Sequence, residues 1–183
     1  KGIPVIVGTP DLQSAAVGSG AVGDFDPHLY LGTSSWLSCH IPFKKTDVSA
    51  NIAALPSAIP TRYFVANEQA TAGACLTFVK NNIYCAGRHS TDAAEADIWA
   101  ALDEIVEKVP AGSNRVIFTP WLYGERTPVE DSSVRASFFN QSLRTTREDL
   151  IRSVYEGVAY NSRWLLQCVE RFVKTRLDEI RMI

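Results

Sequence analysis

The strongest pattern of apolar positions lies near the C-terminus and predicts one long helix. Between residues 150 and 173, Leu, Ile, Val, Tyr and Phe side chains recur with the α-helical period over about seven turns. Thr145 and Glu148 have the spacing of a capping box and predict where this helix begins. Such a stripe is typical of a helix that packs against a sheet, so we interpret it as the core helix of a domain rather than as a partner-binding helix.

Shorter patterns predict three further helices and several strands. Helices are expected over 12–22, 71–81 and 91–109, the second with Thr71 as its N-cap and the third stopped by residues 110–112. Runs rich in β-branched and aromatic residues predict strands over 3–7, 28–32, 35–41, 61–66 and 115–118. Residues 42–60 contain three prolines and no helical period, which predicts a surface excursion. The mixture indicates an α/β domain.

Composition narrows the class of protein. The chain has 183 residues, 46% hydrophobic and 21% charged, which suits one globular domain with a core of ordinary size. A net charge of −2 without a basic stripe argues against nucleic-acid and anionic-membrane partners. No apolar run approaches the roughly 20 residues that a membrane span requires.

Cysteine, histidine and tryptophan residues add no separate chemistry. The cysteines lack metal-ligand spacing, and free buried thiols in a reducing compartment are favoured over disulfides. The histidines also lack such spacing, so no metal site built from protein residues is predicted. The tryptophans are expected in the core, with Trp121 as a candidate for a cleft wall.

Two short segments carry the candidate chemistry. A Gly/Pro turn presents Asp11 at the start of a small-residue helix, where its carboxylate either faces a site or serves as a plain N-cap. The tripeptide Gly32-Thr33-Ser34 follows a strand, and its glycine lets backbone N–H groups curl round an anion, although such tripeptides also occur in ordinary turns. Together they suit phosphoryl transfer, in which an aspartate orients a hydroxyl and accepts its proton late while neutral donors surround the phosphate oxygens.

These segments resemble the FGGY family of carbohydrate kinases, most closely its xylulokinase-like branch. In that family Gly-x-x-Asp-x-x-x-Ala-Ala-x-Gly-x-Gly carries the catalytic base, which falls here on Asp11. The family's Leu-Gly-Thr-Ser, matched by residues 31–34, contacts nucleotide phosphates. Residues 124–128 (Gly-Glu-Arg-Thr-Pro) resemble the loop before the family signature, which would run over 136–156 with Asn140 and Gln141 at unusual positions.

The resemblance implies an actin-like ATPase (RNase H-like) α/β domain, a mixed sheet with flanking helices, incomplete at both ends. Residues 1–22 would end the N-terminal kinase region, and 23–183 would form the front part of the C-terminal domain. The chain would then be a fragment, inactive alone, of a cytoplasmic kinase that uses ATP and Mg²⁺ to phosphorylate a sugar or polyol, with a xylulose-like ketose favoured. Apolar surface left uncovered would favour self-association, so a homodimer is among the expected assemblies.

The expected site residues fall into three roles: a catalytic base, nucleotide contacts and candidates for the substrate cleft. Asp11 is the expected base, and the expected nucleotide contacts are Gly32, Thr33, Ser34 and Gly73. For Gly73 close helix packing is the alternative. The candidates for the substrate cleft are Gly8, Gln13, Glu125 and Arg126. For Glu125 and Arg126 an ion pair that anchors the loop is favoured over substrate binding.

Two other functions are alternatives to the kinase. A nonenzymatic actin-like module that binds nucleotide or sugar as a sensor or scaffold would share the tripeptide but would not need Asp11. An α/β hydrolase would need a nucleophile elbow with a downstream acid and histidine, and the sequence shows none.

Overall fold

The computed structural model describes residues 2–5, 8–86 and 95–183. Its helices are α1 (Asp11–Gly18), α2 (Gly73–Val79), α3 (Glu95–Lys108) and α4 (Arg147–Val173). Its strands are β1 (His28–Leu31), β2 (Ser35–Ser38), β3 (His40–Ile41), β4 (Thr46–Asp47), β5 (Ile52–Pro56), β6 (Tyr63–Ala66), β7 (Ile117–Thr119), β8 (Ser137–Phe139) and β9 (Arg181–Met182). A π-helical turn, Lys80–Tyr84, follows α2, and a 3-10 turn, Ser113–Arg115, precedes β7.

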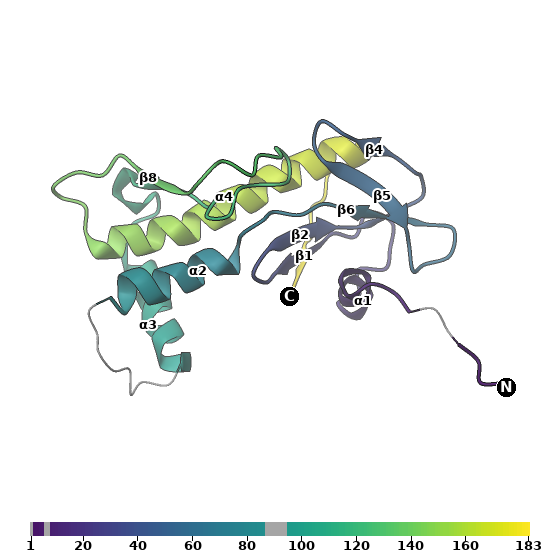
Figure 1. Ribbon diagram of the computed structural model, residues 1–183, viewed down its shortest axis with the longest axis horizontal. Coiled ribbons are helices and arrows are strands. Elements are labelled where there is room, and N and C mark those ends of the chain that lie inside the picture. The colour runs from purple at the N-terminus through teal and green to yellow at the C-terminus, as the bar shows by residue number, and fades with distance from the viewer. Residues whose placement is uncertain (1, 6–7, 87–94) are drawn as a thin grey trace.

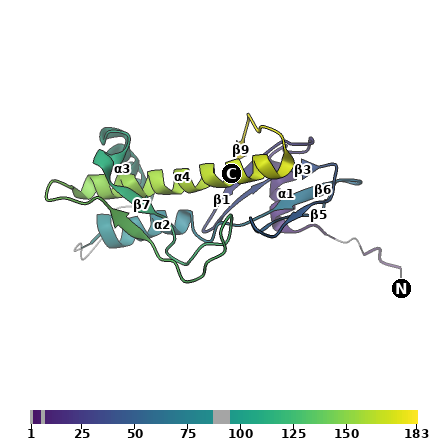
Figure 2. The ribbon, with the colours of Figure 1, turned by 90° about the horizontal axis from the view of Figure 1, so that it is seen from above.

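The strands form three sheets along one helix. Their orders are β2-β1-β9, β3-β6-β5-β4 and β7-β8, with β9 parallel to β1 and the other pairs antiparallel. Figure 1 shows α4 running along the molecule, with the first two sheets and α1 toward one end and α2 and α3 toward the other. Figure 2 shows the same division from above. The predicted mixture of strands and helices is therefore confirmed.

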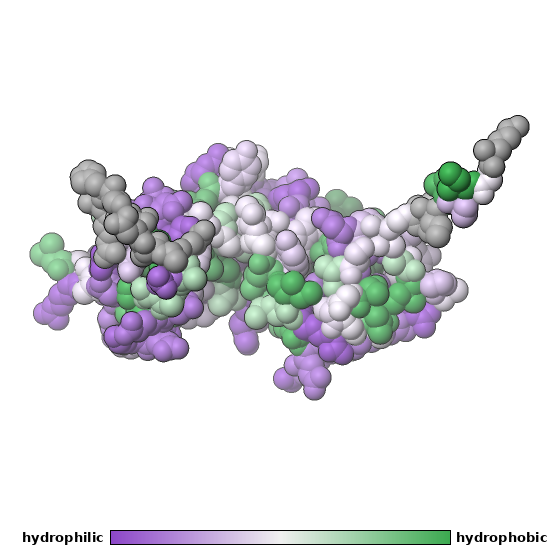
Figure 3. All heavy atoms as spheres, turned by 90° about the horizontal axis from the view of Figure 1, so that it is seen from below, coloured by the Kyte–Doolittle hydropathy of each residue, from purple (hydrophilic) through white to green (hydrophobic). Residues whose placement is uncertain are grey.

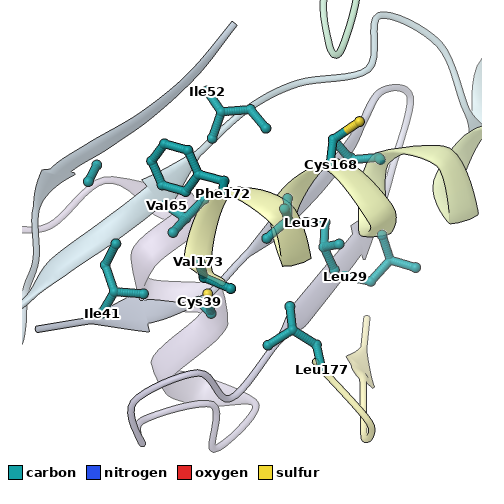
Figure 4. Packing of buried hydrophobic residues seen from close by; sticks show 13 residues of the cluster. Leu29, Leu37, Cys39, Ile41, Ile52, Val65, Cys168, Phe172, Val173 and Leu177 are labelled. Atoms are coloured by element: carbon teal, nitrogen blue, oxygen red, sulfur yellow. The ribbon is translucent and has the colours of Figure 1, made fainter. Parts of the chain in front are cut away.

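Two buried apolar clusters pack on the two halves of α4. The C-terminal half places Phe172 against Leu37 of β2 and Ile52 of β5 (Figure 4). The N-terminal half places Val154 in a cluster with Leu102 of α3. Since both clusters include α4 residues with almost no exposed surface, the predicted role of the long helix as the core helix is confirmed.

The capping box of α4 lies one residue later than the sequence predicted. The N-cap is Thr146, whose hydroxyl accepts from the backbone N–H of Asp149 at 3.2 Å, while the Asp149 carboxylate accepts from the Thr146 N–H at 2.9 Å. An aspartate therefore takes the place that Glu148 was predicted to fill. Burial acts to raise the pKa of Asp149, but bonds from Thr146 and Asn114 bring it below its usual range.

The other element predictions hold in part. Strands β1, β6 and β7 and helices α1, α2 and α3 lie inside or beside their predicted ranges, and the predicted strand over 35–41 is divided into β2 and β3. Residues 91–94 of the third predicted helix lie outside the described residues. The predicted N-cap Thr71 instead donates its hydroxyl hydrogen bond to the carbonyl of Pro120, and the N-cap of α2 is Ala72.

Two element predictions are wrong. No strand forms in the described residues of 3–7, where Ile3 and Val5 are almost fully exposed. The predicted surface excursion over 42–60 contains β4 and β5, and Ile52 of β5 is 1% exposed. Pro42 and Pro60 lie at the ends of this segment and Pro56 is the last residue of β5, so no proline interrupts either strand. No helix in the part of the chain that the structure describes is long and apolar enough to cross a membrane.

Candidate active site

The tripeptide Gly32-Thr33-Ser34 forms the turn between β1 and β2 and docks on the start of α2. The N–H groups of Gly73 and Ala72 donate to the carbonyls of Gly32 and Thr33 at 2.8 and 2.9 Å. A Cβ atom at Gly73 would lie 2.6 Å from the carbonyl oxygen of Gly32, so only glycine fits there without displacement. The structure thus brings the predicted nucleotide residues together, and it gives Gly73 the close packing role that the sequence left as its alternative.

Asp11 is the first residue of α1 and follows Pro10. Its carboxylate is exposed and accepts one hydrogen bond, from the N–H of Leu12 at 2.8 Å. The N-cap is Pro10, which leaves the helix without a side-chain cap, so the alternative of Asp11 as a plain N-cap is wrong. The carboxylate therefore stands at the surface with acceptor capacity to spare.

Gln13 fixes the helix that carries Asp11. Its side-chain N–H donates to the carbonyl of Pro56 at 2.9 Å, and its amide oxygen accepts from the N–H of Ala58 at 2.6 Å. The side chain is 6% exposed. Both ends of the amide are thus engaged with the turn after β5, which indicates that Gln13 positions α1 rather than contacting a substrate through its polar atoms.

A cleft of about 560 Å³ unites the two candidate segments. Asp11 and Gln13 line one side, and Thr33 and Ser34 line another. The hydroxyl of Ser34 accepts from the indole N–H of Trp36 at 3.1 Å, which leaves its own hydrogen free to donate. Segments more than twenty residues apart therefore place a carboxylate and two hydroxyls around one cavity.

Aromatic residues that the sequence analysis missed form a wall of the same cleft. Tyr30 of β1 and Trp36 of β2 are directly paired across the strands, and both line the cleft together with Phe64. Trp36, which was expected in the core, is only partly buried. Residues at equal distances on either side of a hairpin turn share one face. Counting outward from the predicted turn would have found this pair.

The predicted ion pair between Glu125 and Arg126 is wrong. Glu125 is 4% exposed, and its carboxylate accepts from the N–H groups of Ala70 and Arg126 and from the side chain of Asn161. The Arg126 guanidinium instead pairs with Glu68. The anchoring role that the sequence favoured for Glu125 thus agrees with its contacts, although its partner differs.

The remaining candidates lie away from the cleft that holds Asp11. Arg126 lines a second cleft of about 320 Å³, which Trp36 also lines. Gly8 lines neither of these clefts, and a Cβ atom there would meet nothing within 4 Å. Trp121, the candidate cleft wall, lines neither cleft and has a buried indole nitrogen without a partner among the described residues.

A buried histidine supports the turn that holds Gln13. His40 is fully buried, and its Nδ1 atom lies 2.8 Å from the hydroxyl of Ser57, next to Ala58. Burial lowers the pKa of His40, and the nearby carboxylates of Asp24 and Asp26 offset part of that shift. His40 is therefore neutral at neutral pH, as its apolar surroundings require.

The cleft that holds Asp11 offers hydroxyl donors from Thr33 and Ser34. Within residues 2–5, 8–86 and 95–183, no group of three or more His, Cys, Asp and Glu side chains is close enough to hold a metal ion. Hydroxyls and backbone amides in a tight turn can donate to phosphate oxygens.

Comparison with known proteins identifies a matching family and several relatives of this chain. Residues 29–183 match the model of the C-terminal domain of the FGGY family of carbohydrate kinases. A xylulose kinase of Staphylococcus epidermidis is 26% identical over 160 residues, which cover 87% of this chain and 30% of that protein. A gluconokinase of Bacillus subtilis is 26% identical over 159 residues, which cover 86% of this chain and 31% of that protein.

A solved structure shares the fold. The xyloylose (xylulose) kinase of Brucella ovis superposes with a TM-score of 0.80 at 24% identity, covering 94% of this chain and 33% of that chain. The fold is thus the actin-like α/β fold expected from the sequence. The chain spans about 30% of the length of the curated relatives that it matches.

Proposed function

Because the chain belongs to the FGGY family of carbohydrate kinases, we propose that it carries the phosphoryl-transfer part of an ATP-dependent sugar or polyol kinase. A xylulose-like ketose is the favoured acceptor, since xylulose kinases stand among the relatives beside gluconokinases. The observation that carries the proposal is the shared cleft, in which the Asp11 carboxylate faces the same cavity as Thr33 and Ser34. We further propose that residues 1–22, which precede the family match, belong to the preceding kinase region.

The proposed chemistry follows from the donor and acceptor properties of these groups. Asp11 accepts a hydrogen bond from the acceptor hydroxyl and orients it in line with the γ-phosphate of ATP. It takes the hydroxyl proton as the new O–P bond forms and the bond from the γ-phosphorus to the β,γ-bridging oxygen breaks, so that ADP leaves. The hydroxyls of Thr33 and Ser34 and the backbone of their turn donate to phosphate oxygens. Mg²⁺ would be bound mainly by those phosphates, and Asp11 would be a carboxylate in the same cleft. When bound, Mg²⁺ would neutralise charge on the phosphate oxygens.

The test is sugar-dependent ADP release by the protein at its full natural length, with a panel of ketoses, aldoses, polyols and sugar acids. Replacing Asp11 by asparagine should lower kcat at least about 100-fold, the range for loss of a general base. The melting temperature should stay unchanged, because Asp11 is exposed and the asparagine amide oxygen can still accept from Leu12. Asp97→Asn, at an exposed position in α3, is the matched control.

The kinase and the sensor or scaffold predict different outcomes of this test. Near-normal turnover of Asp11→Asn on the best sugar would refute the assignment of the base. ATP binding without ADP release on any sugar would favour the sensor or scaffold, which shares the turn of residues 32–34 (the phosphate turn) and needs no base.

A further inference from the structure

The segment 68–73, between β6 and α2, joins the phosphate turn to a buried carboxylate. Figure 1 shows the chain leaving β6 and passing β2 on its way to α2. On one side, Gln69 and Ser35 exchange two backbone hydrogen bonds, of 2.8 and 3.1 Å, just after the turn. With the bonds from Ala72 and Gly73 described above, the segment is bonded to the phosphate turn at one end and to the residue just after that turn near its other end.

On its other side, the same segment is held by Glu125 and α4. The N–H of Ala70 donates to one carboxylate oxygen of Glu125 at 3.0 Å, and Asn161 of α4 donates to the other oxygen at 2.7 Å. The side chain of Gln69 donates to the backbone carbonyl of Asn161 at 2.7 Å. Glu125, Asn161 and Gln69 are 4%, 6% and 1% exposed. A carboxylate removed from water to this degree is stabilised only while its N–H donors keep their places.

We propose that Glu125 and Asn161 are positioning residues that set the place of the phosphate turn through segment 68–73. This inference rests on the proposed kinase function and adds that different residues position the nucleotide and the sugar. Neither side chain lines the cleft that holds Asp11, so neither touches the acceptor there. A change at this pair should therefore alter use of the nucleotide and leave binding of the sugar almost unchanged.

The sharpest disturbance is Asn161→Asp. It replaces the donor 2.7 Å from the Glu125 carboxylate by a second carboxylate, so that two anions would face each other in a buried site. In the protein at its full natural length, we expect the KM for ATP to rise at least about tenfold, a change worth roughly 1.4 kcal/mol. The KM for the sugar should change less than about twofold, which by the same conversion is a much smaller change in free energy.

The rescue variant is the double change Glu125→Gln with Asn161→Asp. It restores one donor facing one acceptor, since the glutamine N–H can donate to the new carboxylate while its oxygen accepts from Ala70. The KM for ATP should return to within about threefold of wild type, the scale of residual non-additivity between neighbours. Gln167→Glu adds the same charge at an exposed position of α4 and is the matched control, expected to leave both KM values unchanged.

Each outcome decides the inference. A rise in both KM values together, no rise at all, or a double variant no better than Asn161→Asp would overturn it. If Asn161→Asp does not fold, Asn161→Ala removes the donor without adding charge and should raise the KM for ATP alone by a smaller factor, about three- to fivefold. Failure of the proposed function is distinguishable, because wild type would then release no ADP on any sugar.

Discussion

The contact between Gly73 and Gly32 makes a prediction whose size follows from the structure. A Cβ atom at Gly73 would lie 2.6 Å from the Gly32 carbonyl oxygen, whereas ordinary contacts begin at 3.4 Å. The replacement Gly73→Ala must therefore open the contact between the phosphate turn and α2 by about 0.8 Å. Overpacking of this kind costs about 1–3 kcal/mol, and the conformational gain of alanine over glycine returns about 0.5–1 kcal/mol.

The expected net loss for Gly73→Ala is about 0–2.5 kcal/mol, which corresponds to a fall in melting temperature of up to roughly 10 °C for a chain of this size. Because displacement of a reacting group by 1 Å can cost about 100-fold in rate, kcat/KM for ATP should fall about 10- to 100-fold. The assays are thermal melting, followed by circular dichroism, and ADP release at varied ATP with saturating sugar.

Two other glycines separate stability from function. At Gly157 of α4 the added Cβ would meet the Phe118 carbonyl oxygen of β7 at 2.5 Å, so Gly157→Ala should destabilise the fold to a similar extent. Its kcat/KM for ATP should change less than about threefold, since no hydrogen bond in the described part of the chain joins β7 to the phosphate turn. At Gly18 nothing lies within 4 Å, and Gly18→Ala should be harmless. Equal losses of kcat/KM in the variants at 73 and 157 would refute the reasoning.

Three further predictions concern the core, the Asp11 helix and pH. Leu165→Ala, at a fully buried position of α4, should cost about 2–5 kcal/mol of unfolding free energy in urea titrations; a loss below 1 kcal/mol, about the cost of an ordinary surface change, would contradict the packing described. Gln13→Leu should cost about 1–3 kcal/mol and lower kcat more than it raises the KM for ATP, because it frees the helix that carries Asp11; kinetics that show the reverse would argue against its positioning role. Burial lowers the pKa values of His28 and His40, so both take up protons more readily when unfolded; stability should be full above pH about 6.5 and fall, by at most about 1.4 kcal/mol per pH unit for each group, as pH drops from about 6.5 toward their lower folded pKa values. A melting temperature that stays flat from pH 7.5 to 5 would count against this.

Patterns confined to one segment were the part of the fold that the sequence could predict. The apolar stripe of α4 spans many turns, so its period is evident even with the start displaced by one residue. Strand β5 was missed because Ala53 and Ala54 carry little β propensity, and its pairing with β6 supplies what the local sequence lacks. The predicted strand at 3–7 shows the converse, since high propensity in Ile3 and Val5 has no partner strand in the described residues.

In the candidate site too, only the features that are local in the sequence could be predicted. Asp11, Thr33 and Ser34 could be proposed because their chemistry is carried by side chains and by a short spacing in the sequence. The contacts that hold them, from Gln13 to Pro56 and from Gly73 to Gly32, end on backbone carbonyls, which look alike in every residue. Long-range pairing of this kind leaves no mark in composition or period.

The supports of the cleft come from two different sets of contacts, which bears on how the proposed kinase could be altered. The carboxylate side depends on Gln13 and on the turn backed by His40, whereas the phosphate side depends on segment 68–73, Glu125 and Asn161. Among the residues that the structure describes, no hydrogen bond joins these two sets, so their effects on the free energy of the transition state should add within about 0.5 kcal/mol. Combining Gln13→Leu with Asn161→Asp tests this independence. A coupling energy well above that limit in kcat/KM would mean that the two sides of the cleft move as one unit, and that the phosphate turn cannot be displaced without displacing Asp11.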